Sequence, residues 1–567
     1  MPLKSALHSN TFNPYHTILF DLKQYLLKAV TLEQQDLNKR LLLALALSFL
    51  VFIGYSYLFP TPPKQTAQQT ATTQTQTAAA KNAPSQTQEA TGAPRVQSED
   101  SAAPVQTDSK ALATIKSKRY IITVDELGRI ARMELLEAKY KDDKGNNLQI
   151  IDPTKVKPLE IRFADPKINE EAFHTPYANK GISEVEVSNS NHTLTLEQKL
   201  SGLTVTKKIT FEPNGAYSVD IETSKPVKYF ITPGYRPVAD HSMYMLVRGV
   251  LVKGADGVIT TIEDGDAKGD ETFKQAKLVS AFDRYHATLF YDFDKGMDVS
   301  IVKVGEGDPL AFVSAEGTSH IDAYIGPKEY KVLTSIHPGL EDAIEFGWFT
   351  FLAKPFFKIL HWIHDHVGNW GWAIILFTIL VKLVLFPLSY KGMMSMQKLK
   401  DLAPKMKELR EKYKGDPAKL NMKMMEMYKK HGANPMGGCL PMILQIPVFF
   451  ALYRVLLNAV ELQGAPWILW IQDLSKMDPY YVLPVLMGAS MWFQQKITPS
   501  NFTDPMQEKI FKWFPVIMTV FFVTFPAGLV LYWLTNNVLT IAQQYYINHM
   551  YDKYKKQAAL AADKKDK

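Results

Sequence analysis

The stretch GWAIILFTILVKLVLFP, residues 371–387, decides how the chain is interpreted. It is apolar over nearly the length that a helix needs to cross a bilayer, and one lysine, Lys382, interrupts the apolar run. Polar residues follow within a few positions. The pattern therefore predicts a transmembrane helix over Trp370–Tyr390 that carries a cation among apolar residues.

Lys382 lies eight residues before the end of this span at Tyr390, which is roughly 12 Å of helix rise. An ammonium group at that depth costs about 2.5–3.5 kcal/mol unless it faces water or a partner. No Asp or Glu lies inside another predicted span. A water-filled cavity that holds the charge is the simplest interpretation, and a side chain that snorkels to the near interface is the alternative.

Other apolar segments predict further spans, at Leu41–Phe59, Leu440–Val460, Tyr480–Ile497, Phe511–Phe525 and Leu529–Ile547. The last two are separated by Pro526-Ala-Gly528, and one of them is short. The sequence therefore predicts about six transmembrane helices, with one long kinked helix in place of the last two as the alternative. Polar residues within these spans are interpreted individually as helix–helix hydrogen bonds.

Lysine and arginine are distributed unevenly between the spans. Lys391–Cys439 carries twelve of them and the tail after Met550 carries six, whereas Glu461–Pro479 has one. Basic loops remain in the cytoplasm. A multi-pass protein with both termini cytoplasmic follows, and Lys39 and Arg40 before the first span agree with it.

The N-terminal part is predicted to consist of a cytoplasmic segment at residues 1–40, a membrane anchor at 41–59 and a linker at 60–112. A cleaved signal peptide is the alternative to the anchor, but no small-residue cleavage site follows Phe59. The linker is a Gln/Thr/Ala/Pro/Ser tract that cannot bury enough apolar surface to fold. It is therefore expected to be disordered.

Residues 113–340 change to a period-two pattern. HTLTLE (192–197), LTVTKKITF (203–211) and YSVDIE (217–222) alternate apolar and polar residues, and Asn214-Gly215 is a turn signal between the last two. Short strands of this kind predict a β-sandwich. Because the domain follows the anchor, it is expected outside the cytoplasmic membrane, in a periplasm.

Residues 341–366 are predicted to contain an amphipathic helix in the membrane interface, at Phe346–Ile363 with Lys354 and Lys358 one turn apart. The alternative is a continuation of the next span. The membrane core is placed at 367–550.

A cytoplasmic helical hairpin at 391–432 and a basic cytoplasmic tail at 551–567 complete the chain. The hairpin follows from apolar residues at three-to-four spacing and from the break at Lys414-Gly-Asp-Pro417. Its methionines either form the hairpin's own seam or offer a surface to apolar clients.

Composition excludes several classes of function. The chain has 567 residues, a net charge of +7 and one cysteine, Cys439, which rules out an intrachain disulfide and a multi-cysteine zinc site. The sequence has no HExxH, no GxSxG, no P-loop and no Gly-rich dinucleotide turn. We therefore expect no enzyme activity, no catalytic residues, no cofactor and no metal.

Seven short motifs occur in an order that resembles the YidC family of membrane protein insertases. They are GNWG (368–371), NPMGGCLP (434–441), QIPVFFALY (445–453), WIQDLS (470–475), DPYYVLP (478–484), TDPM (503–506) and AGLVLY (527–532). The match is dense from about Phe346 to Tyr551. The N-terminal part matches the longer Gram-negative form more loosely, and that form implies a periplasmic β-supersandwich domain.

The resemblance implies a hydrophilic groove, open to the cytoplasm and to lipid, in which one cation attracts the acidic outer segment of a client. Lys382 falls at the position of that cation, where Gram-negative members usually carry arginine. The client-binding positions implied on the last span are Tyr532 and Trp533, with Thr378 and Gln495 as further candidates. Lysine keeps the charge but loses the planar fork of arginine.

The implied activity is insertion, folding and assembly of integral membrane proteins in the cell inner membrane, alone or with the Sec translocon. The implied partners are nascent membrane-protein clients, the ribosome, the Sec translocon, the lipid bilayer and, as a further candidate, the signal recognition particle receptor, but not DNA. Two alternatives are a secondary transporter that uses Lys382 and a structural envelope scaffold. Transporters usually have internal repeats, which the spans lack, and a scaffold needs no charged groove.

Overall fold

The computed structural model describes residues 110–142, 144–238, 247–347, 349–432, 440–498 and 505–563. The predicted N-terminal segment, the anchor and nearly all of the linker lie outside these ranges. Strand β1 (Ala111–Lys116) begins inside the predicted linker. The predicted end of the linker, residue 112, is therefore two residues too late. Ala111 already belongs to β1 because it pairs with Asp125 of the next strand.

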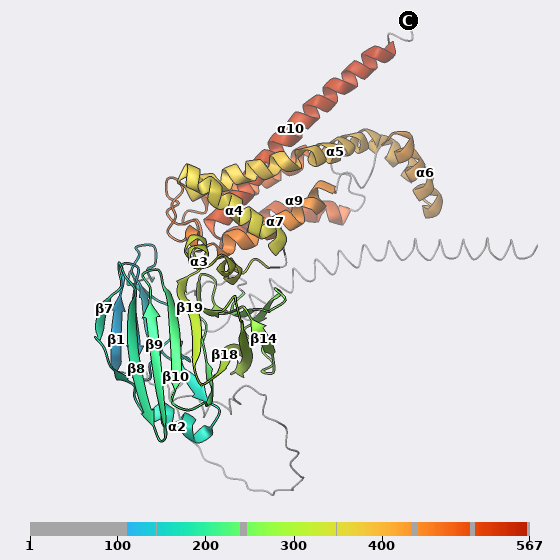
Figure 1. The fold of residues 1–567 in the computed structure, drawn as a ribbon. Coiled ribbons are helices and arrows are strands. Elements are labelled where there is room, and N and C mark those ends of the chain that lie inside the picture. Colours follow the sequence, from blue (N-terminus) through green and yellow to red (C-terminus); the bar gives the residue numbers. More distant parts are fainter. Residues whose placement is uncertain are drawn as a thin grey trace, which may run out of the picture. The chain divides into compact units, whose positions relative to one another are not determined.

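The β-domain, residues 111–327, consists of three sheets (Figure 1). The first has the order β4-β3-β2-β1-β7, with β1, β2 (Tyr120–Asp125), β3 (Ile130–Leu135), β4 (Leu148–Gln149) and β7 (Glu184–Glu186). The second has nine strands in the order β13-β12-β15-β16-β19-β10-β9-β8-β6, namely β6 (Ala178–Asn179), β8 (His192–Leu200), β9 (Leu203–Phe211), β10 (Ala216–Thr223), β12 (Gly249–Lys253), β13 (Ile259–Glu263), β15 (Leu278–Phe282), β16 (His286–Tyr291) and β19 (Ser319–Pro327). The third has the order β14-β17-β18-β11-β5, with β5 (Ile161–Phe163), β11 (Lys228–Ile231), β14 (Thr272–Ala276), β17 (Met297–Val304) and β18 (Asp308–Glu316).

Alternation in the sequence explains the centre of the large sheet. Strand β9 buries every second side chain and pairs antiparallel with β8 and β10, as the period-two pattern predicts. Gly215, in the predicted turn, has a φ of 96°, a conformation that favours glycine. One apolar core joins all three sheets. The prediction of a β-sandwich is confirmed.

Three short helices accompany the sheets. Helix α2 (Pro166–His174) begins at Asp165, whose carboxylate accepts the N–H groups of Lys167 and Ile168. Helix α3 (Tyr330–Ile336) and the 3₁₀ helix η2 (Pro338–Ala343) follow β19 and lead towards the helical part.

Helix α4 (Thr350–Val367) occupies the region predicted as an interfacial helix but begins four residues later. Its two predicted interfacial lysines are ion-paired, Lys354 with Asp342 and Lys358 with Glu341 at 3.0 Å. Lys253 of β12 also lies 2.6 Å from Asp342. These ion pairs tie α4 to the β-domain, and its position in a membrane interface remains a prediction.

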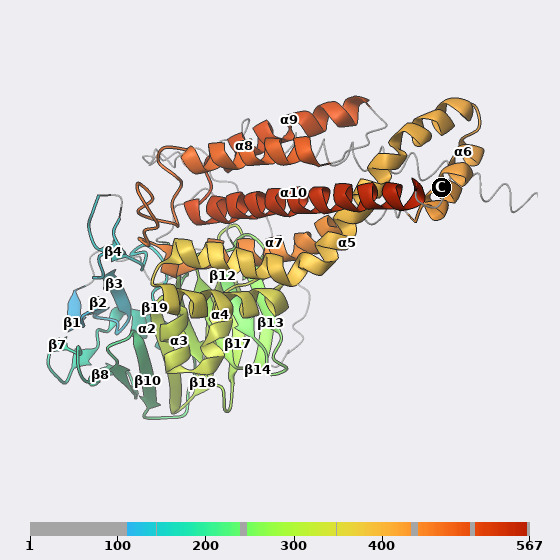
Figure 2. The same cartoon turned by 90° about the horizontal axis from the view of Figure 1, so that it is seen from above.

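Long helices make up the rest of the chain: α5 (Trp370–Lys412), α7 (Leu440–Asn458), α8 (Val482–Ile497), α9 (Pro505–Phe522) and α10 (Ala527–Asp563), with a short 3₁₀ helix, η4 (Val460–Leu462), after α7. Helices α8 and α10 lie side by side (Figure 2). The last two predicted spans are separate helices, so the alternative of one long kinked helix is wrong.

Helix ends do not coincide with the predicted span ends. Helix α5 continues without a break beyond Tyr390, and α10 continues through much of the predicted tail. Among the described residues, only α5 is long and apolar enough to cross a membrane by length and composition. The count of six spans is therefore not confirmed and remains a prediction.

Among the described residues, 401–432 belong to a compact unit that is separate from the rest. Helix α6 (Pro417–Lys430) begins at Asp416, which accepts the N–H of Lys419 at 3.0 Å. The hydroxyl of Tyr428 donates to Sδ of Met406 at 3.6 Å, and both residues are buried. Met406 thus belongs to the hairpin's own seam, whereas Met422 is 57% exposed.

Candidate functional site

Lys382 of α5 contacts α10. Its Nζ donates a hydrogen bond of 2.8 Å to Oγ1 of Thr540, and the Thr540 hydroxyl donates to the carbonyl oxygen of Asn536, one turn earlier, at 2.7 Å. The lysine side chain is half-buried, and among the described residues no carboxylate forms an ion pair with it. A neutral hydroxyl therefore holds this cation.

Asn536 extends the contact to a third helix. Nε2 of Gln445 in α7 donates to Oδ1 of Asn536 at 2.5 Å, and the hydroxyl of Tyr532 also contacts Gln445. We call these five residues, Lys382, Thr540, Asn536, Gln445 and Tyr532, the polar track. It connects α5, α10 and α7 through neutral hydrogen-bonding groups and one positive charge.

A four-residue repeat on α10 supplies most of the polar track and extends beyond it. The repeat consists of Tyr532, Asn536, Thr540, Gln544 and Asn548. Residues at this spacing lie on one face of a helix. Nε2 of Gln544 donates to Oδ1 of Asn548 at 2.6 Å, and Gln397 of α5 donates to the same oxygen. The polar face of α10 is thus paired with α5 at two levels.

Two of the five site residues predicted from the sequence, Lys382 and Tyr532, lie in the polar track. Thr378 does not, because its hydroxyl donates to the carbonyl oxygen of Ile374 in its own helix at 2.7 Å. A hydroxyl used in this way has no donor left for a client. The role of each residue in client binding remains a prediction.

The other two predicted residues make contacts elsewhere. Nε2 of Gln495 in α8 donates to the carbonyl oxygen of Phe511 in α9 at 2.8 Å. Trp533 packs against Phe449 and Phe522, with ring centroids 4.7 Å away in both cases. Gln495 therefore joins α8 to α9, and Trp533 covers α7 next to the polar track.

Sequence reasoning missed Thr540. A hydroxyl is common in membrane spans and usually serves helix packing, so a single threonine attracts no attention. The four-residue spacing from Tyr532 through Asn536 was the available signal, because it places all three on the face that carries the predicted client-contact tyrosine.

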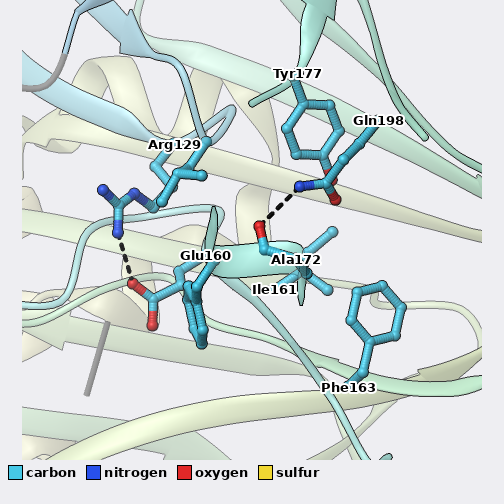
Figure 3. Close-up of a pocket in the computed structure, with 9 residues that line it drawn as sticks. Arg129, Glu160, Ile161, Phe163, Ala172, Tyr177 and Gln198 are labelled. Atoms are coloured by element: carbon cyan, nitrogen blue, oxygen red, sulfur yellow. Dashed lines mark hydrogen bonds and ion pairs between the residues drawn. The ribbon is translucent and has the colours of Figure 1, made fainter. Parts of the chain in front are cut away.

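A small cavity in the β-domain is a weaker candidate (Figure 3). Its volume of about 10 Å³ is the space that one water molecule needs. The charged side chains beside it pair with each other, Arg129 with Glu160 at 3.1 Å, and Gln198 donates to the carbonyl oxygen of Ala172 at 2.8 Å. Across the described ranges, no cluster of three or more His, Cys, Asp or Glu could hold a metal ion.

Two family models match the chain. The model described as 60Kd inner membrane protein matches residues 362–556, and the model described as YidC periplasmic domain matches residues 286–359. The first covers the helices that carry the polar track. The second covers β16 to the middle of α4.

Curated relatives match over nearly their full length. The protein named membrane protein insertase YidC of Campylobacter jejuni subsp. jejuni is 49% identical over 518 residues, covering 91% of this chain and 97% of that protein. The protein of the same name from Helicobacter pylori is 46% identical over 557 residues, covering 93% of this chain and 99% of that protein.

Among solved structures, an active YidC insertase with its first transmembrane domain resolved is 20% identical. It covers 78% of this chain and 95% of its own, with a TM-score of 0.33. The two curated relatives carry the assignment, because both their identity and their coverage are high. This chain belongs to the YidC family of membrane protein insertases, and it is a protein of the inner membrane.

Proposed function

We propose that this insertase receives the acidic outer segment of a membrane-protein client at the polar track, in a groove open to the cytoplasm. One observation carries the proposal: the ammonium group of Lys382 is held by the Thr540 hydroxyl and, among the described residues, by no carboxylate. A client carboxylate would meet an unneutralised charge there. The attraction grows as water is excluded.

The neutral members of the polar track would lower the cost of moving polar backbone past the apolar core. An unpaired amide costs roughly 2–7 kcal/mol on transfer from water to an apolar environment. The side-chain amides of Gln445 and Asn536 offer hydrogen bonds that replace part of the lost hydration, whereas the Thr540 hydroxyl has already used its donor on the Asn536 carbonyl. Burial of the client's apolar helix in lipid, at about 25 cal/mol per Å², would then drive release without nucleotide hydrolysis or a catalytic step by this chain.

The proposed topology has six spans, cytoplasmic termini and a periplasmic β-domain. The uneven distribution of Lys and Arg between the loops supports it. The proposed domain organisation is that of the sequence analysis, with α4 in the outer membrane interface and the hairpin at 391–432 in the cytoplasm.

The proposed partners beyond clients are the ribosome, the Sec translocon and the signal recognition particle receptor. Basic residues in the last turns of α5 and α6 support an anionic partner such as the ribosome, for example Arg410, Lys412, Lys429 and Lys430. The exposed Met422 supports contact with an apolar client segment.

Reconstitution tests the proposal. The full-length protein in liposomes is supplied with ribosomes that synthesise a one-span client with a short acidic outer tail, and protease protection measures insertion. We expect Lys382→Glu to reduce insertion by about tenfold or more, because charge reversal replaces attraction with repulsion. Lys382→Arg is expected to retain insertion.

Two controls make the result specific. Lys274→Glu reverses an exposed charge of the β-domain, whose partner is Asp298 at 2.7 Å, and should leave insertion intact. A client with a neutral tail should be insensitive to Lys382→Glu. Equal insertion of the acidic-tail client by the parent and by Lys382→Glu would rule out the electrostatic role.

A further inference from the structure

The turn between β15 and β16 inserts an arginine at the end of a helix of the membrane core. The turn consists of Asp283, Arg284 and Tyr285, and the Arg284 side chain is buried. Nε of Arg284 donates a hydrogen bond of 2.6 Å to the carbonyl oxygen of Leu457, in the last turn of α7. The two residues are 173 positions apart in the sequence.

The turn holds this arginine rigidly. The buried Asp283 carboxylate accepts the main-chain N–H groups of Tyr285 at 2.8 Å and of His286 at 2.7 Å. The Arg284 guanidinium lies over the Tyr285 ring, 4.5 Å from its centroid, and the Lys328 N–H donates to the Tyr285 carbonyl oxygen at 2.7 Å. These contacts fix the main chain of the turn, and the Tyr285 ring supports the guanidinium that reaches α7.

A helix end is a suitable target for a cation. The last four carbonyl groups of a helix lack partners within the helix, and the helix dipole places a partial negative charge there. Arg284 supplies both a hydrogen-bond donor and a positive charge to this end of α7.

A second contact fixes the same turn of α7. Nδ2 of Asn458 donates to the carbonyl oxygen of Glu345 at 2.8 Å and to its Oε2 at 3.2 Å. Arg454, one turn earlier in α7, places a guanidinium nitrogen 3.5 Å from the same Oε2. The end of α7 is thus held by Arg284 and Glu345, both of which precede the long helices in the sequence.

The same helix supplies the polar track. Gln445 bonds Asn536 and Phe449 packs on Trp533, and Gln445 lies about 18 Å of helix rise before Leu457. A single apolar core continues from the β-domain into α7; it includes Phe282, Leu289, Leu452, Val455 and Leu456. A displacement of α7 at Leu457 is therefore transmitted along the same packed helix to Gln445 in the polar track.

We propose that the β-domain positions the polar track through Arg284, assisted by Glu345 in the segment that joins the β-domain to α4; these two positioning residues fix the position and rotation of α7 and so hold Gln445 against Asn536. This gives the β-domain a part in insertion itself. The inference rests on the proposed function for the use of the track by clients, but not for the placement of α7.

Cross-linking measures that placement directly. In the full-length protein with Cys439→Ser, cysteines replace Gln445 and Asn536, and the rate of their linkage by a short thiol cross-linker is followed in liposomes. We expect Arg284→Met to lower this rate by about fivefold, the effect of losing one charged hydrogen bond. Arg284→Lys, which keeps a donor and the charge, should recover part of the rate.

A matched control separates positioning from loosening of the β-domain. Arg162 is also a buried arginine of this domain, but it pairs with Glu160 at 2.9 Å. Arg162→Met should leave the cross-linking rate unchanged. An equal decrease in Arg162→Met, or an unchanged rate in folded Arg284→Met, would overturn the inference.

Two further measurements keep the test decisive. If Arg284→Met does not fold, Glu345→Ala removes the second contact and should lower the rate by about threefold, whereas an unchanged rate would again overturn the inference. Client insertion is measured beside cross-linking. Insertion that survives Lys382→Glu while Arg284→Met lowers cross-linking would refute the proposed function and support the positioning role.

Discussion

Lys207 of the β-domain and Lys382 of α5 are both withdrawn from solvent, but their surroundings differ. Lys207 is fully buried, and its Nζ donates to the carbonyl oxygens of Gly128 at 2.9 Å and Leu159 at 3.0 Å. Lys382 is half-buried and donates to the Thr540 hydroxyl. One lysine is fixed by the main chain of its own domain, and the other by a single side chain.

Burial and the neighbouring charges together set the protonation of Lys207. Two buried carboxylates, Asp125 and Glu160, already pair with three other cations: Arg129, Lys157 and Arg162. Burial lowers the pKa of Lys207 to about 7, against the attraction of both carboxylates. A neutral amine still has two N–H groups for its two carbonyl partners.

The two lysines differ in whether their positive charge is needed for the contacts that they make. Lys207 can lose its proton and keep both hydrogen bonds, so it acts mainly as a donor. Lys382 has neutral neighbours in the polar track, and its charge is not used by any described ion pair. This arrangement supports the proposed use of the Lys382 charge by a client.

Asp125→Asn should have the largest effect of these variants, because it destabilises the buried charge network around Lys207. The carboxylate is fully buried and lies 2.9 Å from Arg129 and 3.3 Å from Lys157. Its neutralisation leaves buried cations without compensation, which costs about 3–5 kcal/mol of unfolding free energy. Urea denaturation of the full-length protein, followed by hydrogen exchange in β8 to β10, measures the loss.

An exposed ion pair of the same domain serves as the control. Asp298 pairs with Lys274 at 2.7 Å near the surface, and Asp298→Asn should cost less than about 1 kcal/mol. Equal losses in the two variants would show that burial of the Asp125 network contributes nothing to stability.

The pH dependence of unfolding should sharpen the account of Lys207. Its folded pKa of about 7 lies below the ordinary value of 10.5. Between these values the unfolded chain binds a proton that the folded domain does not, so the unfolding free energy rises with pH, by about 1 kcal/mol per pH unit. Below pH 7 both states are protonated and this contribution is constant.

Lys207→Met removes the titrating group and isolates this contribution. The unfolding free energy of the parent minus that of Lys207→Met should increase from pH 7 to pH 9, measured by urea denaturation at each pH. Parallel pH profiles of the two proteins would contradict the assignment of the lowered pKa to Lys207.

Thr540→Val should give the smallest effect and concerns the other lysine. The variant removes the hydroxyl that holds Lys382 but keeps the branched shape, so we expect insertion of an acidic-tail client to fall by about threefold through lost orientation. Thr540→Ser keeps the hydroxyl and should insert normally. Protease protection of the client measures both, and identical insertion by the two variants would remove Thr540 from the site.

Local patterns predicted the strands that have one face in the core and one face towards solvent. Strands β8, β9 and β10 largely alternate buried residues with partly exposed ones, so their period-two signal is strong. Strand β15 is buried at every position and has no such alternation. Its place between β12 and β16 depends on the sheet as a whole rather than on its own residues.

Two of the five polar-track residues were predicted, Lys382 from its own surroundings in the sequence and Tyr532 from the family resemblance. Lys382 stands out because a charge in an apolar run is costly. Thr540 does not, because its partner is 158 positions away and a hydroxyl in a span is ordinary. Arg284 lies in a turn, and its partner on α7 is 173 positions away, so no local pattern indicates that it is buried.

The order of strands in the nine-stranded sheet determines when the sheet can be completed during synthesis. Strand β19 is the last of the domain, yet it lies between β16 and β10. Until the ribosome has made it, both neighbours have an open edge that can recruit other chains. Helix α4 begins only 23 residues after β19 ends. Synthesis of the strand that closes the sheet is therefore followed, within a short interval of elongation, by synthesis of α4.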